Sequence, residues 1–228
     1  MRAAAIIAAS GLGKRMGAAE KKQYLLLEGI PILGRAIGAF LNHPDIKQIV
    51  VVVPPGEIVQ TRKILKPFCS LEYLVFVEGG KRRQDSVYNG LKVVDPSAPF
   101  VCIHDGARPL VSKRLIDAVL EAAMLFGAAV PALPVTDTVK EVAADGFIKG
   151  TVSRDKLRCA QTPQVFRQEL IREAYRKADL LGIQATDDSY LLELLGFKVI
   201  TVPGEPENIK ITCPYDLKIA AALLKGDQ

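Results

Sequence analysis

Short apolar runs rich in β-branched residues alternate along the chain with longer amphipathic stretches. The apolar runs cover residues 3–9, 46–53, 72–77, 100–103, 128–133 and 198–202. The amphipathic stretches cover residues 31–41, 57–66, 84–94, 113–126, 167–181, 187–195 and 214–224. Strands that alternate with helices are typical of a layered α/β domain with a mostly parallel sheet. Residues 49–53 are apolar throughout, which indicates a strand covered on both faces.

Residues at the ends of these segments support the same assignment. Ser112 precedes an amphipathic stretch and can cap the first turn of a helix. Thr186 precedes a stretch whose first turn carries two acidic residues, which suits the helix dipole. Glycines that can end helices stand at Gly127, Gly182 and Gly196. We therefore predict a Rossmann-like three-layer α/β sandwich with a mostly parallel central sheet.

Residues 135–154 depart from this rhythm, because polar and apolar residues alternate around Asp145-Gly146. Asp-Gly between alternating runs is a strong hairpin signal. A hairpin that projects from an α/β body has exposed edges, which need cover. We predict one domain over residues 1–228, with residues 135–154 as an arm that packs on a second subunit of a homodimer. The alternative is a hairpin folded back on its own domain.

Composition excludes several classes of protein. The longest stretch without charge, residues 122–136, contains Gly127 and two prolines and is too short to span a membrane. The four cysteines are widely separated and form no CxxC pair, so a zinc ribbon is improbable. Only two histidines are present, which excludes a multi-histidine metal site. A reducing cytoplasm fits this composition. The net charge of +5 suggests an anionic partner.

The segment directly after the first predicted strand is rich in glycine and cations. Ala9 and Ser10 lead into Gly11, Leu12 and Gly13, and glycines at a strand exit let backbone N–H groups approach phosphate. The spacing fits neither the dinucleotide fingerprint nor the phosphate loop of NTPases. The cations that follow are Lys14, Arg15, Lys21 and Lys22. They favour a polyphosphate site over an exposed loop with solvated charges.

The exit of the third predicted strand has a similar pattern. Gly79 and Gly80 precede three cations, and Ser86 lies in the first turns of the helix that follows. Ser86 could contact a base or a sugar. The alternative is an ordinary helix start in which Asp85 and Ser86 are capping residues.

A third motif, His104-Asp105-Gly106-Ala107-Arg108-Pro109, follows the fourth predicted strand. Asp105 could bind a ribose hydroxyl or a metal, and Arg108 could bind a phosphate with two hydrogen bonds. The alternative is an Asp–Arg pair that braces the loop, and for His104 we expect a hydrogen-bonded core position. Ligands of open α/β sheets bind outside the carboxyl ends of the strands. Glycine and charge at three strand exits therefore predict one ligand site.

Later segments add further candidates. Arg154 follows the arm, Thr162 lies in the segment Gln161-Thr162-Pro163-Gln164, and Thr186 precedes a helix. Residues 207–212 are expected to form a short strand with Lys210 at its centre. The alternative for Lys210 is a solvated lysine on an edge strand, which is common.

Taken together, these motifs resemble a known family along essentially the whole chain. The segments AASGLGKRMG, KKQYLLLEGIPIL, GGKRRQDSV, HDGARP, QTPQVF, TDDSYLLE and ENIKIT, in this order, are similar to the sugar-nucleotide-type nucleotidyltransferases. Within that superfamily they most resemble the cytidylyltransferases that act on 2-C-methyl-D-erythritol 4-phosphate. Two positions depart from the family pattern: Lys21 stands where many members have proline, and Ser10 where alanine or glycine is usual.

The resemblance implies a reaction of CTP with a methylerythritol phosphate that gives a CDP-linked polyol and pyrophosphate. It also implies Mg²⁺ that is held mainly by the CTP phosphates, with no certain metal ligand in the protein. It implies catalytic roles for Arg15 and Lys22 at the α-phosphorus and for Arg154 and Lys210 at the acceptor phosphate. The implied nucleotide-binding residues are Ala9, Ser10, Gly11, Leu12, Gly13, Gly79, Gly80, Ser86 and Asp105. The implied acceptor-binding residues are Arg108, Thr138, Thr162 and Thr186.

A reaction of this kind fits a chain with few histidines, because the attacking phosphate oxygen is already anionic and needs no general base. One alternative is a cytidylyltransferase that uses ribitol 5-phosphate. Another is a nucleotide-binding regulator without catalysis. A nucleic-acid binder is disfavoured, because such domains combine basic surfaces with aromatic stacking residues and this chain has no tryptophan and 6% aromatics.

Overall fold

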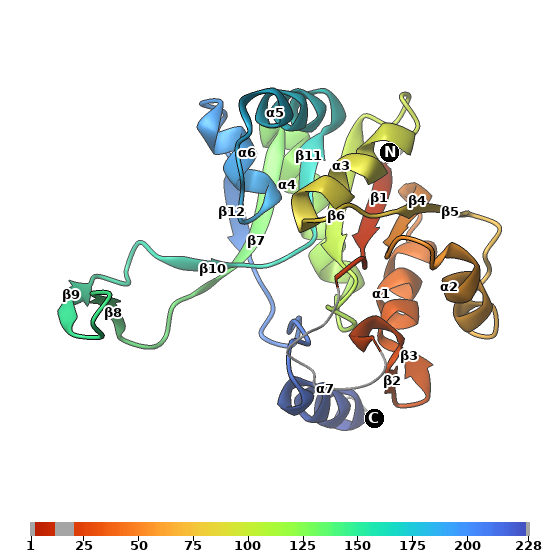
Figure 1. The fold of residues 1–228 in the computed structure, drawn as a ribbon, viewed down its shortest axis with the longest axis horizontal. Coiled ribbons are helices and arrows are strands. Elements are labelled where there is room, and N and C mark those ends of the chain that lie inside the picture. The colour runs from red at the N-terminus through yellow and green to blue at the C-terminus, as the bar shows by residue number, and fades with distance from the viewer. Residues whose placement is uncertain (1–2, 12–20, 227–228) are drawn as a thin grey trace.

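A computed structural model describes residues 3–11 and 21–226 of the chain. Its centre is an eight-stranded sheet with the order β10-β7-β11-β6-β1-β4-β5, in which β12 also pairs with β7 (Figure 1). The strands are β1 (Ala3–Ala8), β4 (Ile46–Val53), β5 (Leu74–Glu78), β6 (Phe100–Asp105), β7 (Ala128–Pro134), β10 (Arg158–Ala160), β11 (Gln164–Arg167) and β12 (Ile200–Pro203). Every predicted strand of the alternating pattern forms part of this sheet.

Helices cover both faces of the sheet. They are α1 (Ile32–Leu41), α2 (Ile58–Leu65), α3 (Arg83–Val93), α4 (Lys113–Phe126), α5 (Gln168–Leu181), α6 (Asp188–Leu194) and α7 (Pro214–Gly226). Successive side chains of β1 and β4 enter two separate hydrophobic cores. Ile7 and Val51 pack with residues of α1, α2 and α4, whereas Ile6 and Val52 pack with residues of α3, α5 and α6. The three-layer prediction is therefore confirmed.

Most of the strand pairing is parallel. β1 pairs with β4 and β6, β4 pairs with β5, and β7 pairs with β12, all in parallel. β11 runs antiparallel between β6 and β7, and β10 runs antiparallel along β7. Because β11 is reversed, its first residue, Gln164, lies beside Ile103 near the carboxyl end of β6. The reversed strand thus brings the segment around Thr162 to the edge where the parallel strands β1 and β6 end.

The ends of the helices follow the expected chemistry. The Ser112 side chain accepts a hydrogen bond from the backbone N–H of Leu115, as an N-cap does. Gly127, Gly182 and Gly196 have φ values of 87°, 64° and 79°, the left-handed conformation that glycine adopts without strain. Asp187 caps α6 by accepting from the N–H of Tyr190 at 3.0 Å.

Residues 207–212 do not form the short strand that the sequence predicts. Their backbone bonds to neighbouring loops instead of to a ladder: the N–H of Ile211 donates to the carbonyl of Ala107 at 2.8 Å, and that of Ile209 donates to Glu207 at 2.7 Å. This irregular segment between β12 and α7 runs past the carboxyl end of β6, so Lys210 reaches the site from a loop.

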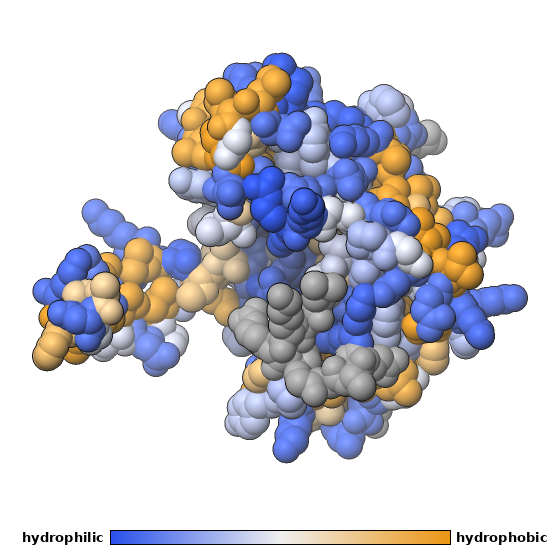
Figure 2. All heavy atoms as spheres, in the orientation of Figure 1, coloured by the Kyte–Doolittle hydropathy of each residue, from blue (hydrophilic) through white to orange (hydrophobic). Residues whose placement is uncertain are grey.

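The hairpin predicted within residues 135–154 is present. β8 (Val139–Val142) and β9 (Ile148–Val152) pair with each other in an antiparallel two-stranded sheet, with Gly146 at φ 90° in the turn. The arm projects from the body of the molecule (Figure 1), and apolar side chains gather on it between hydrophilic ones (Figure 2). The exposed apolar residues are Val142, Phe147, Ile148 and Val152.

A short excursion leads from the first loop to α1. It contains a 3-10 turn (Lys22–Tyr24), β2 (Leu26–Leu27) and β3 (Ile30–Pro31). Over residues 3–11 and 21–226, the chain forms no helix that is long and apolar enough to cross a membrane.

Candidate active site

A cavity of about 340 Å³ lies where β1 and β6 end. It is lined by Ala8, Ala9, Ser10, Gly11, Lys22, Gln23, Pro55, Gly80, Lys81, Arg82, Arg83, Asp105, Gly106, Ala107 and Lys210. Segments from six parts of the chain therefore meet here, including the three glycine-and-charge motifs. Residues from all three strand exits line this one cavity, as expected if the strand exits form one site.

The first two glycine-rich segments are tied together by a pair of serines. The buried Ser86 hydroxyl donates to the carbonyl of Arg82 at 2.9 Å and accepts from the Gly80 N–H at 3.0 Å and from the Ser10 hydroxyl at 2.7 Å. Gly79 fits tightly beside them, because a Cβ atom there would lie 2.4 Å from the Cβ of Ser10. Of the two capping residues in the alternative, Asp85 caps the helix by accepting from the backbone N–H of Arg82 at 3.1 Å, whereas Ser86 joins the two loops.

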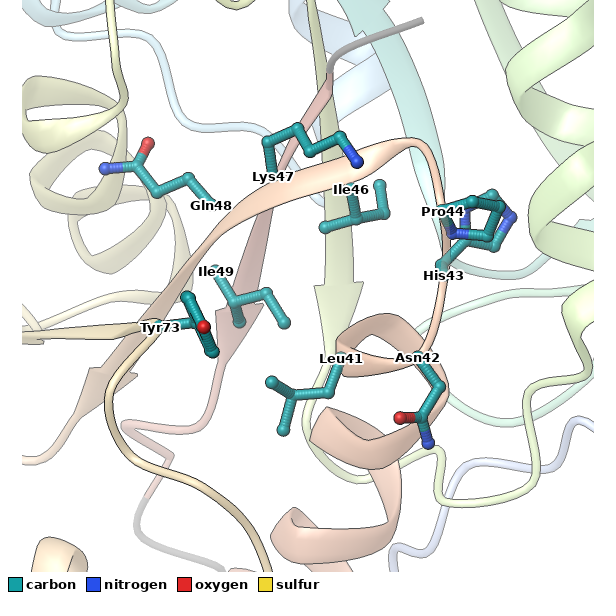
Figure 3. Close-up of a pocket in the computed structure, with 9 residues that line it drawn as sticks. All are labelled: Leu41, Asn42, His43, Pro44, Ile46, Lys47, Gln48, Ile49 and Tyr73. Atoms are coloured by element: carbon teal, nitrogen blue, oxygen red, sulfur yellow. The ribbon is translucent and has the colours of Figure 1, made fainter.

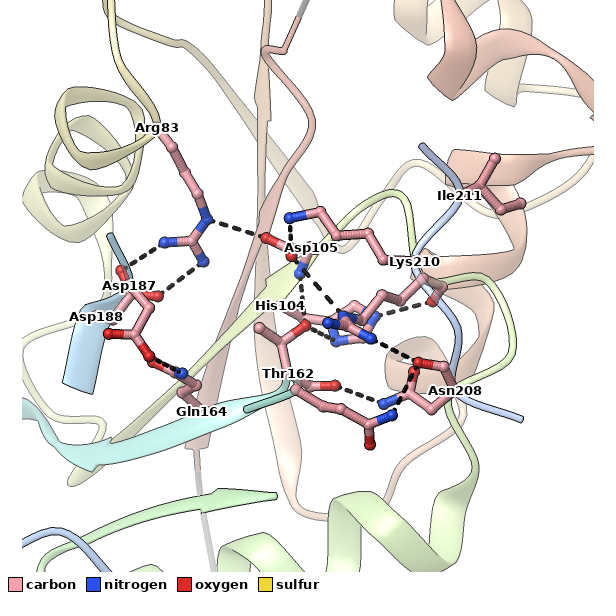
Figure 4. Close-up of polar contacts among 12 residues, drawn as sticks. Arg83, His104, Asp105, Thr162, Gln164, Asp187, Asp188, Asn208, Lys210 and Ile211 are labelled. Carbon is pink, nitrogen blue, oxygen red and sulfur yellow. Dashed lines mark hydrogen bonds and ion pairs between the residues drawn. The ribbon is translucent and has the colours of Figure 1, made fainter. Parts of the chain in front are cut away.

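Among the described residues that line the cavity, the carboxylate belongs to Asp105. Its Oδ1 accepts from Arg83 Nε at 3.0 Å and its Oδ2 lies 2.7 Å from Lys210 Nζ (Figure 4). Arg108 Nε lies 3.8 Å from the same Oδ2. Burial alone would raise the pKa of Asp105, but the three cations outweigh it and hold that pKa well below its usual range. Asp105 is therefore an anion, fixed in place by cations from three segments.

Arg83 is a site residue that the sequence did not single out. Its guanidinium makes two parallel hydrogen bonds to Asp188 at 3.0 and 2.8 Å while its Nε donates to Asp105. Asp188 is fully buried at the start of α6 and also accepts from the hydroxyl of Tyr175. Burial opposes the charge of Arg83, yet the two carboxylates raise the pKa of Arg83 well above its usual value. Arg83 therefore links α3, β6 and α6.

His104 is a core residue, as expected. Its Nε2 bonds the carbonyl of Arg108 at 3.0 Å, so Nε2 carries the proton, and Nδ1 accepts from the Thr162 hydroxyl at 3.1 Å. That hydroxyl accepts from the backbone N–H of Asp105 at 3.0 Å. Burial lowers the pKa of His104 to about 4, so the ring is neutral near pH 7. Thr162 and His104 position the backbone beneath Asp105.

The segment that carries Lys210 is held by buried polar side chains. Arg108 Nη1 donates to the carbonyl of Asn208 at 2.6 Å, and the amide of Asn208 donates to the carbonyl of Thr162 at 2.8 Å. Gln161 donates to the carbonyl of Glu205 at 2.8 Å. Arg108 therefore braces the loop that carries Lys210. This bracing role is closer to the alternative interpretation of Arg108 than to a phosphate-binding role.

The two lysines next to the first loop point to different partners. Lys22 Nζ donates to the carbonyl of Ile211 at 3.0 Å, beside Lys210. Lys21 pairs with Glu57 at the start of α2, and Glu57 also accepts from the Tyr24 hydroxyl at 3.0 Å. A carboxylate thus neutralises the lysine that departs from the family pattern and fastens the turn that carries Lys22.

Not every predicted residue can be placed at this cavity. Leu12, Gly13 and Arg15 lie outside the described residues. Thr138, Arg154 and Thr186 are exposed and do not line the cavity, and the Arg154 guanidinium donates to the carbonyl of Thr136 in the arm. Their assigned roles remain predictions.

A second cavity lies at the opposite ends of the strands, where α1 leads into β4 (Figure 3). Its lining includes Leu41, Ile46, Ile49 and Tyr73, with Lys47 at its edge. None of the predicted site residues that the structure describes lines it, so it is not a candidate for the same chemistry.

The described residues supply no metal site of their own, since no group of three or more His, Cys, Asp or Glu side chains within residues 3–11 and 21–226 could hold an ion. Among the described residues that line the cavity, the carboxylate is that of Asp105, and it is already paired with the side chain of Lys210. The donor set favours binding of anions.

A Rossmann-like sheet with a cation-lined, glycine-rich cavity at its strand ends defines a nucleotide-binding α/β protein. Comparison with known proteins gives the particular family. Residues 3–226 match the model of the family described as IspD, 2-C-methyl-D-erythritol 4-phosphate cytidylyltransferase, and the chain belongs to this family.

Individual relatives agree with this assignment. The enzyme of that name from Pelotomaculum thermopropionicum is 46% identical, over 100% of this chain and 96% of its own. The one from Syntrophus aciditrophicus is 44% identical, over 98% of this chain and 96% of its own. The crystal structure of the Thermus thermophilus cytidylyltransferase superposes with a TM-score of 0.82 at 37% identity, covering 99% of this chain and 100% of that one.

Proposed function

We propose that this chain transfers the cytidylyl group of CTP to 2-C-methyl-D-erythritol 4-phosphate in isoprenoid precursor biosynthesis. The observation that carries the proposal is the cavity where Lys22, Arg83 and Lys210 meet around Asp105 at the ends of β1 and β6, in a chain of this family. Cations from distant segments are what a site needs when it brings two phosphate-bearing substrates together.

The chemistry requires positioning and neutralisation of charge. An oxygen of the acceptor phosphate forms a bond to the α-phosphorus of CTP, the bond from that phosphorus to the bridging oxygen breaks, and pyrophosphate leaves with the electron pair. The attacking oxygen is already anionic, so no proton has to be removed. His104 fits this scheme, because it is buried, neutral and hydrogen-bonded on both nitrogens.

Each part of the cavity has a proposed partner in the substrates. Ala9, Ser10 and Gly11 flank the CTP phosphates, and Gly79, Gly80 and Ser86 shape the position of the base. Asp105 accepts from ribose hydroxyls, since an ionised carboxylate has lone pairs left after binding two cations. Lys22 acts at the α-phosphorus and Lys210 at the acceptor phosphate. Mg²⁺ would enter with the triphosphate and supply neutralisation of its charge, with the phosphates and water as its main ligands.

The experiment that tests the function is a pyrophosphate-release assay with four nucleotides, each paired with 2-C-methyl-D-erythritol 4-phosphate and with ribitol 5-phosphate. We expect turnover with CTP and the methylerythritol acceptor. Preference for ribitol 5-phosphate would overturn the acceptor, and absence of turnover would favour a binding protein. Lys22→Ala should lower kcat by about 10²–10³, by analogy with loss of one oxyanion-hole donor. Lys177→Ala, on the outer surface of α5, is the matched control.

The arm gives the proposal a second part, because Arg154 and Thr138 do not line the cavity of their own chain. We assign them to the acceptor pocket of a partner subunit, in a homodimer that covers the apolar residues of the arm. A symmetric dimer then has two equal sites, each built from both chains.

Subunit mixing tests this arrangement. Lys22→Ala and Arg154→Ala chains should each be inactive, and unfolding and reassembling them together should restore about a quarter of the wild-type activity, from one intact site in each mixed dimer. If Arg154 serves its own chain, the mixture recovers no activity.

A further inference from the structure

The two closest of the three cations around Asp105 differ in how firmly they are fixed. Lys210 Nζ lies 2.7 Å from Oδ2, but Lys210 stands in the irregular segment between β12 and α7 and its side chain is 38% exposed. Arg83 Nε lies 3.0 Å from Oδ1, and the guanidinium of Arg83 also bonds Asp188 at two points. The guanidinium of Arg83 is therefore held by a second carboxylate, whereas Lys210 Nζ ends a long, partly exposed side chain.

The anchor behind Arg83 is buried. Asp188 has no exposed surface, accepts from the buried Tyr175 hydroxyl and lies at the start of α6. Two parallel hydrogen bonds fix the plane of the guanidinium as well as its position. Figure 4 shows Arg83 between the two carboxylates, with one edge toward Asp188 and Nε toward Asp105. Arg83 cannot follow a ligand without breaking this pair.

The proposed reaction makes this difference important, because Lys210 is assigned to the acceptor phosphate. When Lys210 turns to that phosphate, Asp105 loses one of its two close cations while a polyanionic nucleotide lies beside it. Nearby negative charge and burial both favour the protonated carboxyl. A protonated or displaced Asp105 would accept ribose hydroxyls poorly. Arg108 Nε, at 3.8 Å, is too far from Oδ2 for a hydrogen bond, so the fixed close cation is Arg83.

We propose that Arg83 is a positioning residue that keeps Asp105 ionised and oriented toward the ribose hydroxyls of the nucleotide, and that it sets the preference for ribose over deoxyribose. The inference rests on the proposed function, in which Asp105 binds the ribose. Arg83 acts through Asp105 and needs no contact with the reacting atoms.

The test measures kcat/KM for CTP and for its 2′-deoxy and 3′-deoxy analogues, with the methylerythritol acceptor at saturation. Asp105→Asn first tests the ribose assignment, and it should lower the preference for CTP over at least one analogue by about tenfold or more, the effect of a hydrogen bond to a charged group. Arg83→Gln should lower the same preference by a similar factor, and the double variant should lose little more than either single one. Arg172→Gln, a partly buried arginine that bonds Gln168 and the carbonyl of Val94, should keep it.

Arg83→Gln leaves Asp188 without its cation and could unfold the chain. The variant Arg83→Met with Asp188→Asn removes this buried charge and keeps an acceptor for Tyr175, so it tests the same point in a folded protein. Wild-type preference in this variant, with Asp105→Asn impaired, would overturn the role of Arg83. An unchanged preference in Asp105→Asn would instead overturn the ribose assignment itself.

Discussion

Gly79→Ala should disrupt the contact between the first two glycine-rich loops. The new Cβ would lie 2.4 Å from Ser10 Cβ, 2.7 Å from Ser10 Oγ and 2.8 Å from Ser86 Oγ, all shorter than real Cβ contacts. Ser86 cannot easily move, because its hydroxyl bonds Arg82, Gly80 and Ser10. The strain must therefore appear as separation of the loop after β5 from the loop after β1.

Overpacking of this kind costs about 1–3 kcal/mol. Urea denaturation should show a loss of this size in the free energy of unfolding. Because both loops flank the proposed nucleotide site, kcat/KM for CTP should also fall by about tenfold, which corresponds to 1.4 kcal/mol.

Ser10→Gly provides the decisive comparison, since it removes two of the three close atoms. The double variant should regain part of the stability, with a coupling energy of about 0.5–3 kcal/mol, and Ser86 Oγ should prevent full recovery. Gly38→Ala is the matched control, because that glycine lies within α1 with open space around it and alanine there should stabilise the helix by about 1 kcal/mol. Wild-type stability in Gly79→Ala, or strict additivity with Ser10→Gly, would refute the reasoning.

Three further predictions follow from buried or paired charges. Burial lowers the pKa of His104 from 6.5 to about 4, so on acidification the unfolded chain binds this proton before the folded chain does. The free energy of unfolding should therefore fall by about 1.4 kcal/mol per pH unit as pH drops from about 6.5 to 4. Urea titrations of His104→Gln should lack this part of the pH dependence, and an equal pH dependence in both proteins would contradict the prediction. Lys21→Ala should lower kcat by up to about fivefold, because the partly exposed ion pair with Glu57 contributes up to about 1 kcal/mol. Lys21→Pro should retain the rate, because Lys21 has φ −67°, the angle at which the proline ring fixes the backbone. A faster alanine variant than proline variant would exclude the proposed role of Lys21 in fastening this turn. Asp188→Ala should destabilise the fold by about 3–5 kcal/mol, because it leaves Arg83 without its buried partner, and a loss no larger than that of the exposed Glu121→Ala would show that the pair is not needed.

Most elements of the fold were predictable because they follow hydrophobic periodicity. β4 and α4 match their predicted ranges to the residue, and the others differ by a few residues at their ends. β10 and β11 were missed, since each has only three or four residues and no recognisable period. The segment 207–212 has the alternation of a strand, but its backbone groups bond to loops and tertiary contacts override the pattern.

The site was predictable at the level of motifs and less so at the level of contacts. Glycine and charge after β1, β5 and β6 correctly indicated which loops meet. Nothing in the run Lys81-Arg82-Arg83 distinguishes the arginine that bonds Asp105 from the exposed Arg82, which pairs locally with Asp85. The partner that selects Arg83 is Asp188, which is 105 positions away in the sequence. Such a pair becomes visible only when the chain is folded.

The reversed strand β11 also has a consequence for how the chain reaches its folded state. Strands β1, β4, β5 and β6 come from the first half of the chain and can pair with one another early, but β6 has its other neighbour only when β11 inserts beside it. All six residues of β6 are buried in the finished sheet. Until β11 inserts, their unpaired backbone groups form an apolar edge that can pair with another chain. Before β11 inserts, this unpaired edge therefore favours association with another chain.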